Sequence, residues 1–167
     1  MTSRASRGPG LRVDKPVKIH WEGSKSVAEN ARDKLPELSH GFFEAGRELA
    51  ASHSSLQALH RFRLLTKRFR YTLELFRPCY GPGLARRIEA LKTLQQYLGE
   101  VSDCRTTREL LAGRDDLSKA VRDRLTRQLK VLAAARVARF RRLWRKDFAQ
   151  PERERSWTDY LRRFARN

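Results

Sequence analysis

The stretch from residue 60 to residue 76 predicts a helix with two opposite faces. At about 100° per residue, its apolar side chains fall on one stripe and its cations gather on the other side. No acidic residue interrupts the basic run before Glu74. A helix rises about 1.5 Å per residue, so the cations extend for roughly 15 Å, which suits an elongated polyanion better than one small anion. The apolar stripe holds Phe62, Leu65, Phe69, Leu73 and Phe76, and the basic side holds His60, Arg63, Lys67 and Arg70, flanked by Arg61 and Arg68.

The rest of the chain also shows helical periodicity, and it has no strand-like alternation of useful length. Gly and Pro residues separate the helical stretches by short turns, which favours antiparallel neighbours. Pro36 should kink or restart the first helix because it removes a backbone donor, and Gly99 should end the third. The sequence therefore predicts an all-α fold, an antiparallel four-helix bundle with additional helices.

The expected helices run from a cap at Ser24 or Ser26 to about residue 52, and then over about residues 56–76, 84–98, 102–111, 117–148 and 157–164. The expected buried side of the 117–148 helix consists of Val121, Leu125, Leu129, Leu132, Val137, Phe140 and Trp144.

The chain is strongly basic, with a formal net charge of +18 over 167 residues. Such a charge attracts anionic partners, so it points to nucleic acid, an anionic membrane surface or a condensed phosphate polymer. Residues 114–167 carry seventeen Lys and Arg against seven Asp and Glu, whereas residues 26–113 carry fourteen against ten. The middle of the chain has less net charge but arranges it along one helix face, and arrangement is the stronger indication of a site.

The length fits one domain. Residues 1–24 combine Gly, Pro and scattered cations, which predicts a flexible basic arm in front of a single helical domain at residues 25–167, with Trp21 held against the domain. No apolar leader and no membrane-spanning stretch is evident. Cys79 and Cys104 lack metal-ligand spacing and are expected to be free thiols. Together these features favour a cytoplasmic protein.

The basic helix resembles the signature helix of the CHAD family, the conserved histidine α-helical domain. That signature has His, then Arg three residues on, a Lys/Arg pair at seven and eight, and Arg at ten. Residues 70–78, residues 91–99 and Asp103 are similar to the family pattern as well, so the resemblance covers roughly residues 26–112. The matching positions of the signature here are His60, Arg63, Lys67, Arg68 and Arg70.

The resemblance implies a helical protein that binds inorganic polyphosphate, often near polyphosphate granules. It favours Lys92 as a further contributor, although spacing alone leaves that residue undecided. Typical family members contain two related bundles, whereas this chain carries one copy of the His helix, and Ser102 stands where many family repeats carry Arg. One hypothesis is that two chains dimerise to rebuild the missing half. A sedimentation measurement that finds a monomer even with polyphosphate present would contradict it.

Each candidate residue also has a simpler interpretation. His60 would then be a surface or capping histidine, and the cations would form a solvated helix face. Solvated faces usually mix signs to gain ion pairs one turn apart, and the like charges of Arg63 and Lys67 instead repel each other. Arg105 could contact phosphate beside the free N–H groups of a helix start, or it could pair with Asp103 or Glu109.

Three functions compete at this stage. The first is non-enzymatic polyphosphate binding without a cofactor, through His60, Arg63, Lys67, Arg68, Arg70, Lys92 and Arg105. The second is nonspecific nucleic-acid binding by the same cations, although no recognised nucleic-acid-binding motif is present. The third is catalysis on phosphate chains, which usually needs metal-binding carboxylates near the cations. Glu74 has no evident partner carboxylate, and the histidines show no metal-site clustering, so we expect no enzyme and no metal site.

Overall fold

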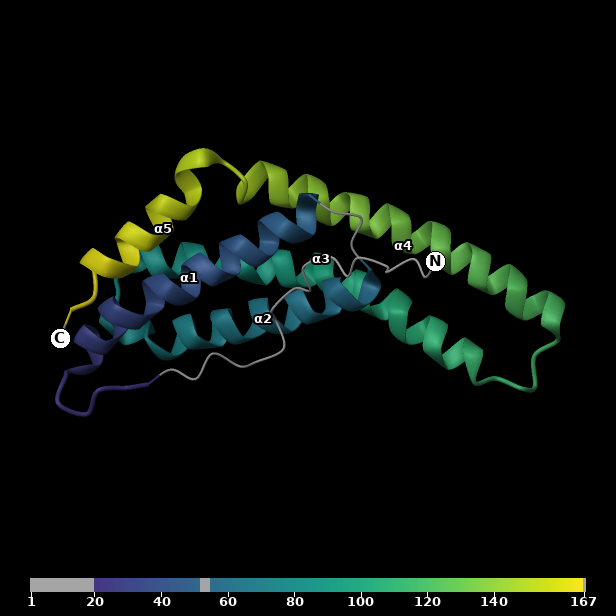
Figure 1. Ribbon diagram of the computed structural model, residues 1–167, viewed down its shortest axis with the longest axis horizontal. Helices are drawn as coiled ribbons and strands as arrows, with labels where there is room; N and C mark the ends of the chain where they lie inside the picture. The colour runs from purple at the N-terminus through teal and green to yellow at the C-terminus, as the bar shows by residue number, and fades with distance from the viewer. Residues whose placement is uncertain (1–19, 52–54, 167) are drawn as a thin grey trace, which may run out of the picture.

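The computed structural model describes residues 20–51 and 55–166 of the chain, and these residues form five α-helices and one short 3₁₀ helix. No strand occurs among them. The all-α prediction is therefore confirmed (Figure 1). The elements are α1 (Val27–Ala51), α2 (Leu56–Leu75), η1 (Arg77–Cys79), α3 (Pro82–Ala112), α4 (Lys119–Asp147) and α5 (Pro151–Arg163).

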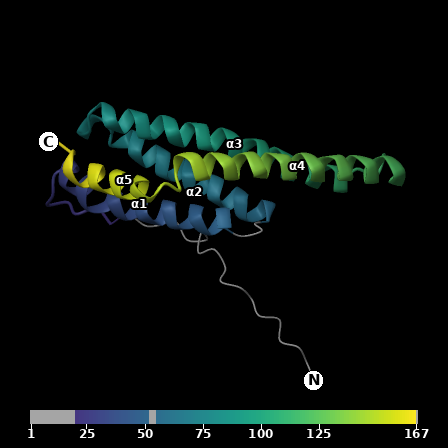
Figure 2. The same ribbon diagram turned by 90° about the horizontal axis from the view of Figure 1, so that it is seen from above.

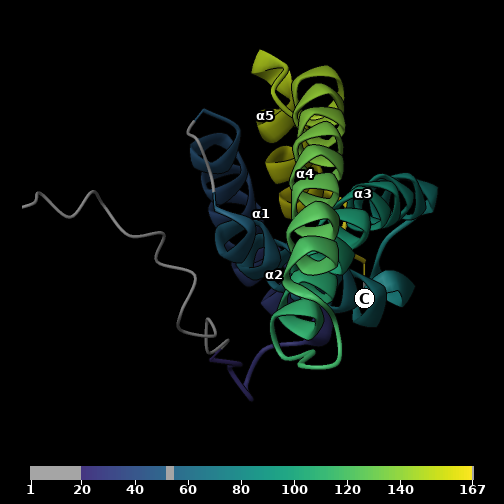
Figure 3. The same cartoon turned by 90° about the vertical axis from the view of Figure 1, so that its right-hand side faces the viewer.

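Helices α1 to α4 alternate in direction around one aromatic core, and α5 continues beyond the end of α4 and packs along α1 (Figure 1). The most extensive contacts join α2 to α3, α3 to α4 and α1 to α5. Seen end on, α1 and α3 lie on opposite sides of α4 (Figure 3). At the centre of the core, the Phe42 ring lies 5.2 Å from that of Phe69 and 5.7 Å from that of Trp144. Gly46 permits this packing, because a Cβ there would collide with the Trp144 ring.

Side chains at the helix starts explain where α1 and α2 begin. The Ser26 hydroxyl accepts a hydrogen bond from the Glu29 amide, and the Glu29 carboxylate accepts one from the Ser26 amide. This reciprocal pair is a capping box, so Ser26 rather than Ser24 caps the first helix. The Ser55 hydroxyl caps α2 by accepting from the Ala58 amide at 3.1 Å. Caps of this type stabilise a helix by about 1 kcal/mol.

Three helix boundaries differ from those predicted. α1 does not restart at Pro36, and α3 runs through Gly99 without a break. Glycine costs a helix interior only about 1 kcal/mol, and buried Leu98 and Val101 on either side of Gly99 hold the helix against the core. The last helix starts at Pro151 rather than near residue 157. Proline suits a first helical position, where its missing N–H has no partner to lose.

The first half of α4 is far more exposed than predicted. Val121 and Leu132 are 37% and 43% exposed, and the deeply buried apolar residues are confined to Ala133 and the second half. The reason is that the end of α3 and the start of α4 extend beyond the ends of α1 and α2 as a two-helix projection (Figures 1 and 2). Phe140 and Trp144 are buried as expected.

The segment before α1 is described only from residue 20, so most of the predicted basic arm lies outside the described residues. The Trp21 ring lies 5.1 Å from the ring of Phe76, which confirms its contact with the helical body. Cys79 and Cys104 are free thiols. Within residues 20–51 and 55–166, none of the helices is long and apolar enough to cross a membrane.

Candidate polyanion-binding site

α2 has the two faces that its sequence predicts. Phe62, Phe69 and Leu73 are at most 3% exposed and fix the helix against the core. On the other side, His60, Arg63 and Arg70 are half-buried, and Lys67 and Arg68 are exposed. The rotation of α2 is therefore set by aromatic burial, and this rotation carries the cations to the edge of the helix.

His60 brings the basic edge of α2 into contact with α3. Its Nδ1 atom and the Ser102 hydroxyl form a hydrogen bond of 3.2 Å. α2 and α3 run antiparallel, so equal steps along the two helices keep residues level with one another. Three residues after His60 on α2 and three residues before Ser102 on α3, Arg63 and Gly99 lie at the same height along the helix pair. Ten residues from the contact, Arg70 and Lys92 lie at the same height. We call the junction the basic seam: His60, Arg63, Lys67 and Arg70 of α2 beside Ser102 and Arg105 of α3.

The basic seam leaves His60 neutral. Burial lowers the pKa of the ring below its ordinary value, the charges of Arg105 and Arg63 lower it further, and Glu109 opposes them. The ring thus lies near three charged residues from two helices, Arg63 of α2 and Arg105 and Glu109 of α3. A neutral imidazole offers one N–H donor and one acceptor, so near neutral pH His60 contributes a directed hydrogen bond and no charge.

The seven predicted site residues fall into two groups by their ion pairs. Arg70, Lys92 and Arg105 each bind a carboxylate one turn away on the same helix, at 2.5, 2.6 and 2.5 Å. The carboxylates belong to Glu74, Glu89 and Glu109, respectively. In the described part of the chain, Arg63, Lys67 and Arg68 have no such partner.

The structure places the two candidates that the sequence left open, Arg105 and Lys92, in ion pairs with neighbouring glutamates. Arg105 pairs with Glu109, and its expected place beside free N–H groups is wrong because α3 is continuous there. Arg68 lies about 100° around α2 from Lys67, so it flanks the basic seam without lining it. Lys92 is exposed and forms an ion pair with Glu89.

Tyr71 and Ser102 were not among the predicted site residues. The Arg70 guanidinium lies 4.3 Å from the centre of the Tyr71 ring, and the Lys67 ammonium lies 5.6 Å from it. Such cation–π contacts hold both cations over the helix surface. Tyr71 sits four residues after Lys67, a spacing that places two helical side chains side by side, so this contact was readable from the sequence. The Ser102 contact depends on the helix register and was not.

Two cations of the second basic run, residues 136–146, join α4 to α3. Arg136 donates to the Glu100 carbonyl, and Arg139 pairs with the Glu100 carboxylate at 3.1 Å. Arg139 also lies 5.1 Å from the centre of the Tyr97 ring.

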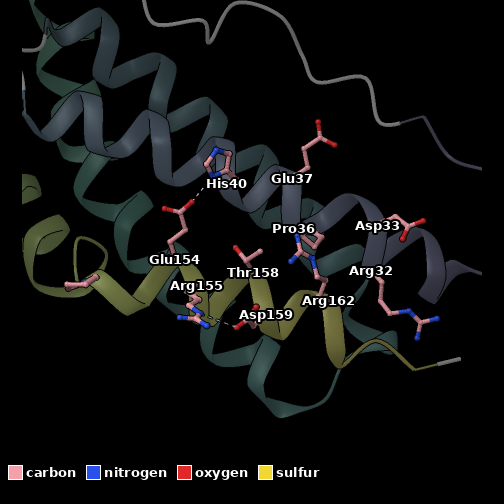
Figure 4. Close-up of a pocket in the computed structure, with 11 residues that line it drawn as sticks. Arg32, Asp33, Pro36, Glu37, His40, Glu154, Arg155, Thr158, Asp159 and Arg162 are labelled. Atoms are coloured by element: carbon pink, nitrogen blue, oxygen red, sulfur yellow. Dashed lines mark hydrogen bonds and ion pairs between the residues drawn. The ribbon is translucent and has the colours of Figure 1, made fainter.

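A hollow of about 980 Å³ lies elsewhere, between α1 and α5. Its walls carry charges of both signs (Figure 4). Glu154 projects toward α1, where it binds Arg47 and the His40 ring. Among the described residues, no group of three His, Cys, Asp or Glu side chains is placed to hold a metal ion.

The family comparison covers the helices that build the basic seam. The family model described as the CHAD domain matches residues 11–112, a range that takes in α1, α2 and α3. The chain belongs to the CHAD family. All seven candidate residues lie within the CHAD domain match, whereas α4 and α5 lie beyond it. No curated protein and no solved structure gives a match.

Proposed function

We propose that this CHAD protein binds inorganic polyphosphate through the basic seam and does not act on it chemically. The observation that carries the proposal is the row of cations without carboxylate partners, Arg63 and Lys67, beside half-buried His60. Two like charges one turn apart repel each other slightly in the free protein. A bound polyanion removes that repulsion, so the arrangement favours a ligand with regularly repeated negative charges.

The chemistry of the residues suits phosphate oxygens. The Arg63 guanidinium can donate to two oxygens at once, and the Lys67 ammonium adds a mobile point charge. The hydrogen-bonded pair of His60 and Ser102 adds one neutral donor at one end of the seam. A linear phosphate polymer presents oxygens along its whole length, so it can engage α2 at successive turns. The family's link with polyphosphate supports the same ligand.

Binding without catalysis is proposed because Glu74 is already engaged by Arg70. A carboxylate in this state neutralises a cation and is poorly placed to serve as a base.

We also propose a cytoplasmic location at polyphosphate granules. A fluorescent fusion that stays diffuse in cells containing such granules would contradict the location.

Nucleic-acid binding is the second candidate, favoured by the net charge of +18. Such binding would depend on overall charge and salt more than on the basic seam.

Dimerisation remains a separate prediction. Exposed apolar side chains on the α3–α4 projection, such as Leu110 and Val131, offer a surface for it, and sedimentation with and without polyphosphate tests it.

A competition assay tests the proposed ligand. The protein is titrated with long-chain polyphosphate and with single-stranded DNA at equal phosphate concentration and several salt concentrations. We expect polyphosphate to displace DNA at a much lower phosphate concentration than DNA displaces polyphosphate. Equal displacement at every salt concentration would mean that the protein binds any polyanion according to its charge, and it would overturn the proposal.

Two double variants locate the site. Arg63→Ala/Lys67→Ala removes two charges from the basic seam, and Arg162→Ala/Arg163→Ala removes two exposed charges from the last turn of α5. Each variant loses two positive charges, so the two have the same net charge. A difference in polyphosphate affinity between them therefore depends on the position of the lost charges alone. We expect the first pair to lose most of the preference over DNA and the second to keep it. Circular dichroism confirms that both are folded.

A further inference from the structure

Gly99 is a glycine that the fold does not require. It lies in the interior of the 31-residue helix α3, where glycine is less favourable than alanine. A Cβ built on it would meet nothing within 4 Å. No glycine among the described residues adopts a positive φ. Neither close packing nor backbone conformation therefore explains its presence.

The position of Gly99 relates it to the basic seam. Lys92, Gln95, Gly99 and Ser102 follow at intervals of three and four residues, so they share one face of α3. Ser102 on this face contacts His60, and the antiparallel register sets Gly99 level with Arg63. The α3 backbone is therefore without a side chain, and open, at the level of Arg63, the first cation of the basic seam that lacks a carboxylate partner among the described residues.

We infer that Gly99 is a positioning residue for the polyphosphate proposed above: it leaves room for the phosphate chain to lie against α3 within reach of Arg63. The inference rests on the proposed function. A side chain at this point would occupy the open space and push the chain outward, away from the half-buried guanidinium. Exposed Lys67 has the longer reach, so the loss falls mainly on contacts with Arg63 and His60.

The test uses Gly99→Ala and Gly99→Leu, with Gly41→Ala and Gly41→Leu as matched controls. Gly41 also lies in a helix interior, is exposed, and would place a Cβ in open space. Replacing either glycine by alanine should raise the Tm by about 2–4 °C, because alanine is the better helix former. A structural role alone therefore predicts greater stability and unchanged binding at both positions.

Polyphosphate affinity separates the two positions. We expect Gly99→Leu to bind about tenfold more weakly, the equivalent of one charge-assisted hydrogen bond, and Gly99→Ala to lose less. The Gly41 variants should bind like the wild type. Falling affinity with a rising Tm is the expected signature at residue 99. If Gly99→Leu is poorly folded, the alanine variant still carries the test.

The outcomes distinguish this inference from the function on which it rests. Wild-type affinity in both Gly99 variants, together with a loss in Arg63→Ala/Lys67→Ala, would overturn the role of Gly99 and leave the binding site in place. If the wild type shows no preference for polyphosphate over DNA, the proposed function fails and the role of Gly99 fails with it. Equal losses at residues 41 and 99 would also overturn the inference.

Discussion

The basic seam and the hollow between α1 and α5 both gather cations from their helices, yet they treat those cations differently. In the hollow, Glu154 of α5 reaches across to Arg47 and His40 of α1, and Arg155 lies within 3.8 Å of Asp159. In the basic seam, ion pairs form only within a helix, and they leave Arg63 and Lys67 over. The walls of the hollow therefore hold carboxylates together with arginines, whereas the basic seam holds two neighbouring cations that no carboxylate within residues 20–51 and 55–166 pairs.

This difference is why we place the proposed binding site by its unpaired cations and not by concavity or net charge. Burial tends to raise the pKa of Glu154, but hydrogen bonds from Arg47 and His40 outweigh it and lower the pKa. The pKa of His60 is lowered by burial and then by neighbouring arginines. Positive surroundings thus stabilise the charged acid in the hollow and destabilise a charged base in the seam. The first arrangement joins two helices, and the second leaves positive charge without a carboxylate partner in the part of the chain that the structure describes.

The largest effect is expected from reversing charges in one region and then in the other. Arg63→Glu/Lys67→Glu should weaken polyphosphate binding by about a hundredfold or more, since hydrogen bonds to charged groups contribute about 1.5–3 kcal/mol each. Arg155→Glu/Arg162→Glu makes the same change in net charge within the hollow and should have a small effect. Isothermal titration at fixed salt measures both. Comparable losses in the two variants would erase the distinction between the regions.

The sequence predicts one side of this comparison better than the other. The helical spacing of Phe62, Phe69 and Leu73 fixes which edge of α2 is basic, because burial of aromatic rings determines its rotation. The pairing of Arg105 with Glu109 is also foreseeable, since residues four apart are neighbours on a helix. The contact between His60 and Ser102 joins residues 42 positions apart. It depends on how α2 and α3 align, which local patterns do not contain.

The wrong predictions share a physical cause. A break at Gly99 was expected from local preference, but the preference is only about 1 kcal/mol and tertiary packing exceeds it. The exposed half of α4 was expected to be buried because periodicity shows which face is apolar. Periodicity does not show how far the neighbouring helices extend. The start of α4 runs beside the end of α3, beyond the ends of α1 and α2 (Figure 1), and Val121 and Leu132 in this half of the helix stay 37% and 43% exposed.

The second prediction increases the difference in charge between the basic seam and the hollow by removing carboxylates from the seam. Glu74→Gln and Glu109→Gln should free Arg70 and Arg105. Each should raise polyphosphate affinity by about fivefold, the equivalent of about 1 kcal/mol for a charge removed near the surface. Glu37→Gln adds the same charge at an exposed position in the hollow and is the control. A gain of the same size in the control would show that net charge alone sets affinity.

The third prediction concerns stability on the other side of the comparison. Glu154→Gln should lower the free energy of unfolding by about 0.5–1 kcal/mol near neutral pH, since its partners are largely solvent-exposed. The lowered pKa of Glu154 means that its contribution is present above the ordinary carboxyl pKa and is lost as pH falls through the lowered value. Thermal melts of variant and wild type should therefore converge in acid. Polyphosphate affinity should not change, and a loss of affinity would connect the hollow with binding.

The smallest effect is expected from the protonation of His60. Its pKa in the free protein is below the ordinary value, and a bound polyanion favours the charged ring, so binding should take up a proton. Affinity should rise as pH falls from about 7.5 to about 5.5, a range that brackets the ordinary histidine pKa of about 6.5. In His60→Gln, this rise should be roughly threefold smaller than in the wild type.

The free protein should respond to acid in the opposite sense. Because the pKa of His60 is lowered on folding, the unfolded chain takes up the proton more readily, and stability falls as pH drops below about 6.5. Polyphosphate should offset this loss in the wild type and less so in His60→Gln. His40→Gln removes a histidine from the hollow, beside Glu154, and serves as the matched variant for binding. If it changes the pH dependence of affinity as much as His60→Gln does, the proton is not bound at the basic seam, and His60 has no part in holding the phosphate chain.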